Sequence, residues 1–496
     1  MKDLHVPWLE LAILVPMIGG LLVSRIREAD QARRWCVAFT GLAFALAIGE
    51  YIDFQWVQAH EVDDPGHLMR LLFGREVFVV DEISSPLLAL TALLYVLTAI
   101  ATTRLKVRHF SFAGMLFSEA IMLATFSCKE PWIVIGLLAA DTIRPYLELK
   151  ARDKPTGVYV WHMALYVLLL VVGQSLIDWE NSRAGSDAHS HSLWAILPLL
   201  GAVLIRSGIA PFHCWITDLF EHSTFGTALL FVAPLTGAYA AVRLLLPVAH
   251  DHVLHAMGGL SLFTAVYAGG MALVQREGRR FFCYLFLSHS ALVLVGLEMV
   301  TPVGLTGALS MWLSLGLSLG GFGLTLRALE ARRGLLALNT FQGLYEHTPT
   351  LAICFALTGL ASVGFPGTLG FVGTELLVDG AVELYSPVVG ATVVIAGALN
   401  GIAIVRAYFL LFTGTRYVSN IALAASRRER FAVLTLAGLL LLGGLAPQFN
   451  IASRFEAAEQ VLKERHSNQL DTSQPLMELL GQVAVPVESN PTGEDR

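Results

Sequence analysis

Residues 303–326, VGLTGALSMWLSLGLSLGGFGLTL, contain no charged side chain. A helix needs about 20 mostly apolar residues to cross a bilayer, so this stretch predicts a membrane-spanning helix. Similar runs recur along the 496-residue chain, of which only 15% of the residues are charged, against about 25% in a typical soluble domain. The sequence therefore predicts an all-α polytopic membrane protein.

The apolar runs predict about fourteen transmembrane helices, with boundaries defined to a few residues. We expect the first run, beginning at Val6, to be a retained span, because no small-residue cleavage site precedes Arg25. The expected spans are residues 7–24, 35–57, 86–103, 109–128, 131–149, 157–178, 193–212, 224–247, 255–275, 281–299, 303–328, 349–375, 385–413 and 430–447.

Charge alternates between successive loops, and an excess of Lys and Arg marks the cytoplasmic loops of membrane proteins. The loops expected on that side contain Arg25–Arg34, Arg104–Arg108, Lys150–Lys154, Arg276–Arg280, Arg327–Arg333 and Arg427–Arg430. The intervening loops are acidic or neutral, and the acidic segment Asp218–Glu221 on the basic side is the exception. This pattern predicts a multi-pass protein of the cell inner membrane, surrounded by lipid, with both termini on the periplasmic face.

Two expected spans contain helix breakers. Pro211 lies near the end of the seventh, and Gly364-Phe365-Pro366-Gly367 interrupts the twelfth. Irregular backbone at membrane depth is tolerated where it is buried in protein or lines a wet cavity, and broken helices often mark an ion path in transporters. A simple packing kink is the alternative for both sites.

Ionisable side chains within spans are costly, by roughly 2.5–3.5 kcal/mol on insertion scales, and are therefore candidates for function. The candidates for a proton or ion relay are Glu119, Asp141, Arg206, His213, His289, Glu375 and Arg406. Structural explanations remain open for three of them. Asp141 is spaced to pair with Arg144 at i,i+3, Arg406 is placed to extend toward the cytoplasmic surface, and Glu375 to cap the interrupted helix.

The sequence offers no motif for a bound cofactor or nucleic acid. Five scattered cysteines without a CxxC do not suit an iron–sulfur cluster, and neither GxGxxG after a strand nor a Walker A sequence occurs. Two histidine groups, His189 with His191 and His250 with His252 and His255, could bind Zn²⁺, although solvated loops are the commoner explanation. We expect no cofactor, no metal and no nucleic-acid partner.

Several motifs together resemble the antiporter-like subunits of respiratory complex I, most closely the M-type subunit, and their relatives in multi-subunit sodium/proton antiporters. The resemblance covers roughly residues 70–415 in order. The motifs are Val80–Leu87, Glu119–Leu123, Pro211–Trp215 with Asp218, Gly237–Tyr239 with Arg243, Ala272–Gln275 with Arg279, Arg280, Ser288 and His289, Gly304–Leu309, and Leu360–Gly367 with Gly370–Gly373.

The resemblance implies two inverted five-helix repeats. On this basis residues 1–108 hold the first three helices, 109–247 the first repeat, 255–413 the second repeat, and 430–447 the last transmembrane helix. Residues 448–496 form a polar tail, with a short amphipathic helix expected near 452–466 and disorder beyond it.

The resemblance also implies a central row of charged groups, from which this chain departs. Arg206 stands where the family has a lysine on the seventh helix, and arginine essentially never deprotonates. Asp141 lies beside the position of the fifth-helix glutamate, which falls near Ala140. Leu235 and Leu315 stand at the lysine and histidine positions of the eighth and eleventh helices. Past Pro366 the polar residues are Glu375, Asn400 and Arg406.

These features favour a membrane subunit of a proton- or cation-translocating complex that moves protons through buried charged residues. Two alternatives stay open: a non-conducting structural subunit, and the membrane half of a proton-driven inorganic-carbon uptake complex with a cytoplasmic zinc protein. The isolated chain is not expected to be an enzyme, although it could belong to an NADH:quinone oxidoreductase-like complex. Its expected partners are other membrane subunits.

Overall fold

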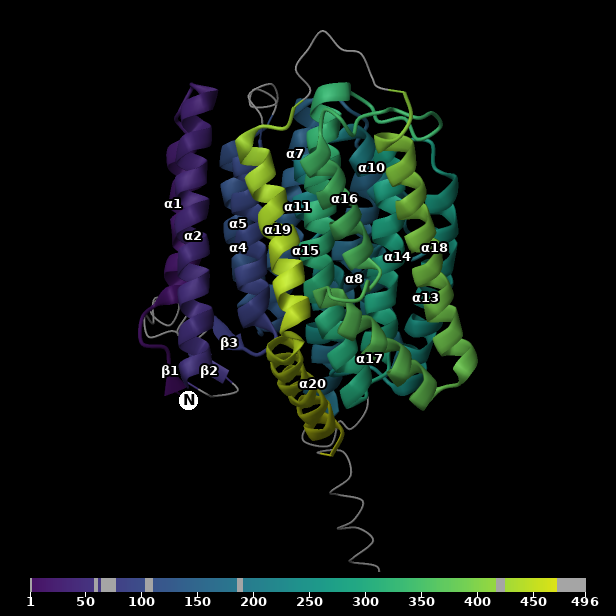
Figure 1. Cartoon of the computed structure of the whole chain (residues 1–496). Coiled ribbons are helices and arrows are strands. Elements are labelled where there is room, and N and C mark those ends of the chain that lie inside the picture. Colours follow the sequence, from purple (N-terminus) through teal and green to yellow (C-terminus); the bar gives the residue numbers. More distant parts are fainter. Residues whose placement is uncertain are drawn as a thin grey trace, which may run out of the picture.

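The computed structural model describes residues 2–57, 61–63, 77–102, 110–184, 191–415 and 424–470. The expected basic loop at Arg104–Arg108, the histidine His189 and the tail beyond residue 470 lie outside these residues. The described chain forms a bundle of long, roughly parallel helices with a small sheet at one end (Figure 1). The all-α class is therefore as the sequence predicts.

Eight helices of the described chain are long and apolar enough to cross a membrane. They are α2 (Ala29–Val57), α4 (Ser84–Ala101), α8 (Gly157–Ala184), the connected run of α11 (Phe225–Val232), α12 (Thr236–Ala240) and the π-helix η3 (Ala241–Leu245), then α13 (Asp251–Val274), α14 (Gly278–Glu298), α15 (Pro302–Arg333) and α18 (Pro387–Phe412). Four shorter apolar helices accompany them: α1 (Trp8–Ser24), α5 (Phe112–Phe126), α9 (Leu193–Ser207) and α16 (Pro349–Ser362).

The remaining helices continue an apolar helix across a break or a bend. These are α6 (Pro131–Asp141) with α7 (Ile143–Ala151), α10 (Cys214–His222) after α9, α17 (Leu369–Leu384) after α16, and α19 (Arg427–Leu445) with α20 (Pro447–Leu470). The last pair is bent by 82°. The chain is non-helical from 208 to 213 and from 363 to 368, around Pro211 and Pro366. The break between α11 and α12, at Pro234, is one that the sequence analysis missed.

Each of the fourteen expected spans overlaps one of these helices or broken helices. How many of them cross a membrane stays a prediction. The first described strand and the last described helix lie at the same end of the bundle (Figure 1), which fits an even number of crossings. The helix expected near 452–466 is present but longer than predicted: α20 extends from Pro447 to Leu470. It packs against α15.

α15 lies at the centre of the bundle and packs against α4, α14, α16, α17, α19 and α20. Its glycines allow close approach: a Cβ on Gly307 would lie 2.7 Å from the backbone nitrogen of Leu377 in α17. Large apolar side chains such as Trp194, Leu445 and Val388 are exposed on the outside of the bundle. An apolar exterior around a core that also holds polar groups is what a lipid environment allows.

The three strands form one sheet in the order β1 (Lys2–Asp3), β2 (Glu61–Asp63), β3 (Val79–Asp81). β1 pairs with β2 in parallel and β2 with β3 in antiparallel orientation, with Val62 opposite Val80. The sheet lies at the same end of the bundle as α20 (Figure 1). It places Asp81 at the entry to α4.

Candidate functional site: buried charges in the helix bundle

The structure brings together two of the candidate residues, Asp141 and Arg206. Asp141 is the last residue of α6, and Arg206 lies in the last turn of α9. The Nη2 atom of Arg206 donates to Oδ2 of Asp141 at 3.2 Å, and each side chain is only 3% exposed. A buried ion pair needs additional hydrogen bonds to offset its desolvation, and the surroundings of Arg206 supply them.

The expected pairing of Asp141 with Arg144 is wrong in the described structure. The helix is interrupted at Thr142, where Pro145 has no N–H to donate to the carbonyl of Asp141. Arg144 instead donates from Nη2 to the hydroxyl of Thr227 at 3.4 Å, and its guanidinium lies 5.7 Å from the centre of the Phe110 ring. Asp141 therefore pairs with Arg206, while Arg144 acts on it only through a longer electrostatic interaction.

Arg206 also stabilises the break between α11 and α12. Its Nη2 atom donates to the carbonyl of Phe231 at 3.0 Å, while its guanidinium lies 3.9 Å from the centre of the Phe231 ring. That carbonyl loses its regular helical partner because the amide of Leu235 donates to Val232 instead. The single cation therefore joins three helices, α6, α9 and α11.

Leu235 lies at the same break, and α15 contributes Trp312 and, three residues further on, Leu315; we call these three residues the apolar block. All three are buried. The indole nitrogen of Trp312 donates to the carbonyl of Pro234 at 3.0 Å. Leu235 adopts a left-handed conformation, with φ 57° and ψ 48°, which costs a non-glycine residue about 1–2 kcal/mol. Protein groups therefore bond two carbonyls at this break, those of Phe231 and Pro234.

Glu119 is fully buried in α5, and neither carboxyl oxygen has a hydrogen-bond partner among the described residues. Tyr95 of α4, also buried, lies near Ser118 and within electrostatic reach of Glu119, Asp141 and Arg144. The sequence analysis missed Tyr95. A tyrosine in the middle of a predicted span that contains no charged residue is the signal that could have identified it. Tyr95 therefore lies within electrostatic reach of both Glu119 and the Asp141–Arg206 pair.

His289 of α14 is buried, and neither ring nitrogen has a partner within the part of the chain that the structure describes. It lines a cavity of about 350 Å³, together with Val363 at the break between α16 and α17, Thr374 of α17 and Gly397 of α18. A polar network adjoins it, since the amide of Asn400 donates to Ser288 at 2.8 Å, and Ser288 donates to the carbonyl of Ala265 at 2.7 Å. Asn400 is thus linked to the residue next to His289.

The other three candidates lie apart from these groups. His213 is half-buried against the rings of Tyr267 and Tyr284. Glu375 is exposed on α17. Arg406 is half-buried and donates to the carbonyls of Gln275 and Leu338, in loops at the ends of helices. This position is as expected for an arginine that extends to the end of the bundle.

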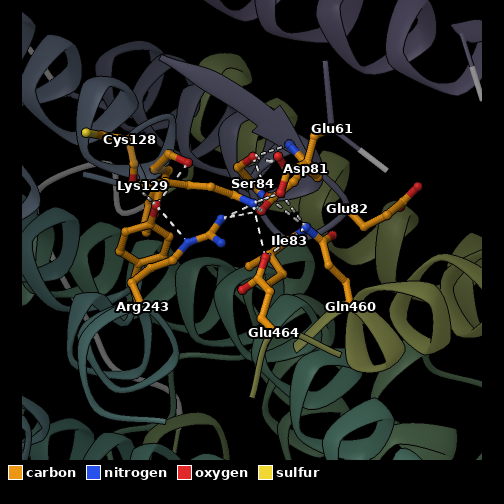
Figure 2. Close-up of polar contacts among 12 residues, drawn as sticks. Glu61, Asp81, Glu82, Ile83, Ser84, Cys128, Lys129, Arg243, Gln460 and Glu464 are labelled. Carbon is orange, nitrogen blue, oxygen red and sulfur yellow. Dashed lines mark hydrogen bonds and ion pairs between the residues drawn. The ribbon is translucent and has the colours of Figure 1, made fainter. Parts of the chain in front are cut away.

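Figure 2 shows a second charged cluster, around Asp81. From the sequence, Asp81 and Arg243 were known only as members of two motifs of the resemblance, and nothing predicted that they meet. Asp81 accepts two hydrogen bonds from Nη2 of Arg243, at 2.9 and 2.7 Å, and lies 3.1 Å from Nζ of Lys129. Lys129 also contacts Glu61 and Glu464. Although burial opposes ionisation, Arg243 and Lys129 hold the pKa of Asp81 well below its usual range. The cluster joins the sheet, the loop before α6, η3 and α20.

No group of three or more His, Cys, Asp or Glu side chains converges as a metal site within the described ranges. His250 stacks on His252 and contacts the carbonyl of His191. His189 lies outside the described residues, so the zinc alternative for the first histidine group stays untested.

Comparisons with known proteins agree with the membrane-protein fold described above. The family described as "NADH:quinone oxidoreductase/Mrp antiporter, TM" matches residues 162–400. NAD(P)H-quinone oxidoreductase chain 4 1 of Synechococcus elongatus is 26% identical over 475 residues, covering 89% of each chain. NADH-quinone oxidoreductase subunit 13 of Thermus thermophilus is 26% identical over 458 residues, covering 87% of this chain and 94% of the relative.

Two solved structures share the fold. A chain of respiratory complex I from Thermus thermophilus superposes with a TM-score of 0.79 at 23% identity, covering 92% of this chain and 99% of that one. A chain of the Mrp complex from a Dietzia species gives a TM-score of 0.79 at 17% identity, covering 94% and 99%. Taken together, the family match over residues 162–400, the nearly full-length relatives and the shared fold show that this chain is similar to membrane subunits of NADH:quinone oxidoreductases and of the Mrp antiporter.

Proposed function

We propose that the chain is a membrane subunit of a proton- or cation-translocating complex of the inner membrane, and that it moves protons past its buried charged residues. The Asp141–Arg206 pair carries the proposal, because it lies inside the bundle at the break of one helix and bonds the open backbone of another. Buried charges of this kind commonly mark ion pathways in membrane proteins. About fourteen spans, two inverted repeats and periplasmic termini belong to the same proposal.

The roles differ because the chemistry of the side chains differs. Arg206 keeps its charge and therefore acts as a fixed cation that favours the carboxylate form of Asp141. Glu119 and Asp141 are the groups that gain and lose protons on one side of the apolar block, with Tyr95 and Ser118 as hydroxyls near them. His289, in its cavity, is the titratable group on the other side.

The apolar block separates these two segments. Leu235 and Leu315 cannot exchange protons, and Trp312 occupies the carbonyl that water would otherwise reach. Net transport through the whole chain therefore requires a hydrated route beside the block during turnover. This feature favours a second candidate function, a non-conducting subunit that holds membrane partners together. The inorganic-carbon alternative stays a prediction, for which a neighbouring gene for a large cytoplasmic zinc protein would be the simplest support.

Proton flux in proteoliposomes containing the intact complex tests the proposal. We expect Asp141→Asn and Glu119→Gln each to lower proton flux at least tenfold, because each variant removes a side chain that can bind and release a proton. A tenfold loss corresponds to about 1.4 kcal/mol in the barrier. Glu375→Gln is the comparison variant, because it neutralises a relay candidate that lies at an exposed position, and we expect it to change flux least. If wild-type flux is absent with all partners present, or if the three variants conduct alike, the structural role is the better account.

A further inference from the structure

A groove of about 620 Å³ runs between α5 and the α6–α7 segment, on the outside of the bundle and apart from the apolar block. From α5 it is lined by Ser111, Phe117 and Ile121, and from α7 by Arg144, Leu147 and Arg152. At about 1.5 Å per residue, Ser111 and Ile121 lie about 15 Å apart along α5. The groove is therefore long enough for a large part of an acyl chain.

The lining of the groove combines basic and apolar side chains. Arg144 and Arg152 lie along α7, the helix that ends in the basic loop Lys150–Lys154, whereas Ile143 and Leu147 are apolar and more than half exposed, at 53% and 56%. An occupant that covers both parts must be amphipathic, with an anionic group at one end.

The acidic residue of the groove, Glu148, does not cancel this positive charge. Its carboxylate already accepts from the amide of Thr224 at 2.6 Å and from the hydroxyl of Thr227. Its ion pair with Arg152 is longer, at 3.7 Å. With two arginines and one glutamate the lining carries a net positive charge. Arginine binds phosphate through paired N–H groups, so the groove is complementary to a phosphate.

We propose that this groove binds an anionic phospholipid, with the phosphate between Arg144 and Arg152 and an acyl chain along Phe117, Ile121 and Leu147. Basic pockets between transmembrane helices on the cytoplasmic side are typical sites for anionic headgroups, and the loop after α7 belongs to the expected cytoplasmic set. Lipid binding does not depend on whether the chain conducts protons.

Native mass spectrometry of the purified chain titrated with phosphatidylglycerol, and separately with phosphatidylcholine, tests the proposal. We expect tighter binding of phosphatidylglycerol, and about tenfold weaker binding in Arg152→Gln, which corresponds to about 1.4 kcal/mol. Lys150→Gln is the matched control: it removes the same charge from the same helix but lies outside the groove lining. Leu147→Trp should weaken both lipids by filling the apolar part.

Three results would overturn the proposal: equal binding of the two lipids by the wild type, an equal loss in Lys150→Gln and Arg152→Gln, or lipid binding that Leu147→Trp leaves unchanged. Cross-linking a cysteine at position 147 to a neighbouring subunit, with lipid absent from the intact complex, would also contradict it, because a protein helix would then fill the groove. Arg152 is a surface residue at the end of α7, so its variant should fold even where an Arg144 variant does not.

Discussion

Asp81 is fully buried, and the cations Arg243 and Lys129 face its carboxylate. The backbone amides of Ile83 and Ser84 also donate to it, at 3.2 and 2.9 Å. Removing one partner from a buried ion pair leaves an uncompensated charge, whereas an exposed pair contributes little. Losing a charge from this cluster should therefore lower the free energy of unfolding more than losing a charge from the surface.

Asp81→Asn should lower the free energy of unfolding by about 3–5 kcal/mol, because it leaves the buried Arg243 without a carboxylate and removes one of the three carboxylates around Lys129. Thermal unfolding of the purified protein in one detergent provides the measurement. Glu221→Gln is the control, since its pair with Arg280 is about half exposed and should be worth about 0–1 kcal/mol. Similar melting temperatures for the two variants would show that the buried cluster does not hold this end of the bundle together.

The depressed pKa of Asp81 sets the sign of its pH effect. A group whose pKa is lower in the folded state stabilises the fold above its unfolded pKa, about 3.9, and loses that contribution as the pH falls further. Between pH 5 and pH 8 the contribution of Asp81 should therefore be constant. Any pH dependence of stability in that range must come from other groups.

At the scale of elements, α20 is held to the bundle by contacts with the entry to α4. Ser453 donates to Oε2 of Glu82 at 3.1 Å, and Nη2 of the buried Arg454 donates to the carbonyl of Glu82 at 2.5 Å. Burial raises the pKa of Glu82 to about 7, with Arg454 opposing the shift and Glu456 adding to it. Ionisation of Glu82 thus disfavours this contact.

The melting temperature should fall, by roughly 2–4 °C, as the pH rises from 5 to 8. A raised pKa contributes stability that is present below the unfolded value, near 4.3, and is lost as the pH rises through the folded value, near 7. Glu82→Gln should flatten this part of the pH profile. An unchanged profile in the variant would assign the pH dependence to another group.

The break between α16 and α17 depends on two glycines with positive φ, Gly364 at 77° and Gly367 at 84°. A Cβ on Gly364 would lie 2.6 Å from Oγ1 of Thr374, whereas a Cβ on Gly367 would meet nothing within 4 Å. Gly367→Ala should therefore cost about 1–2 kcal/mol, from the backbone alone.

Gly364→Ala should cost about 1–3 kcal/mol more than Gly367→Ala, because it adds an overpacked contact to the same backbone strain. Thermal unfolding of the two variants in parallel measures the difference. Equal losses would indicate that Thr374 moves freely and that this break is not tightly packed.

Sequence reasoning located the elements better than the site. Runs such as residues 303–326 fixed the positions of helices, because lipid requires long apolar segments. The partner of Asp141 could not be predicted, since Arg206 is 65 positions away and the break at Thr142 redirects the chain. Pro234 and Pro145 were visible signals of breaks that the analysis did not use. The apolar block could be predicted only in part: Leu235 and Leu315 followed from the resemblance, but Trp312 required the fold.

For the whole molecule, we propose that the titratable groups form two segments, one on either side of the apolar block. Glu119, Tyr95 and the Asp141–Arg206 pair form one, and His289 with its cavity forms the other. Under the proposed function, these groups persist inside an apolar bundle because protons travel past them. Without that function, well-packed apolar side chains would serve stability equally well or better.

Ordered water in a high-resolution experimental map of the intact complex is the most direct test of this claim. The account predicts water bonded to the carboxylate of Glu119 and continuing to Asp141, and water at the ring of His289 in its cavity. Dry packing around all three residues would contradict it, and the chain would then be a structural subunit with the fold of a transporter.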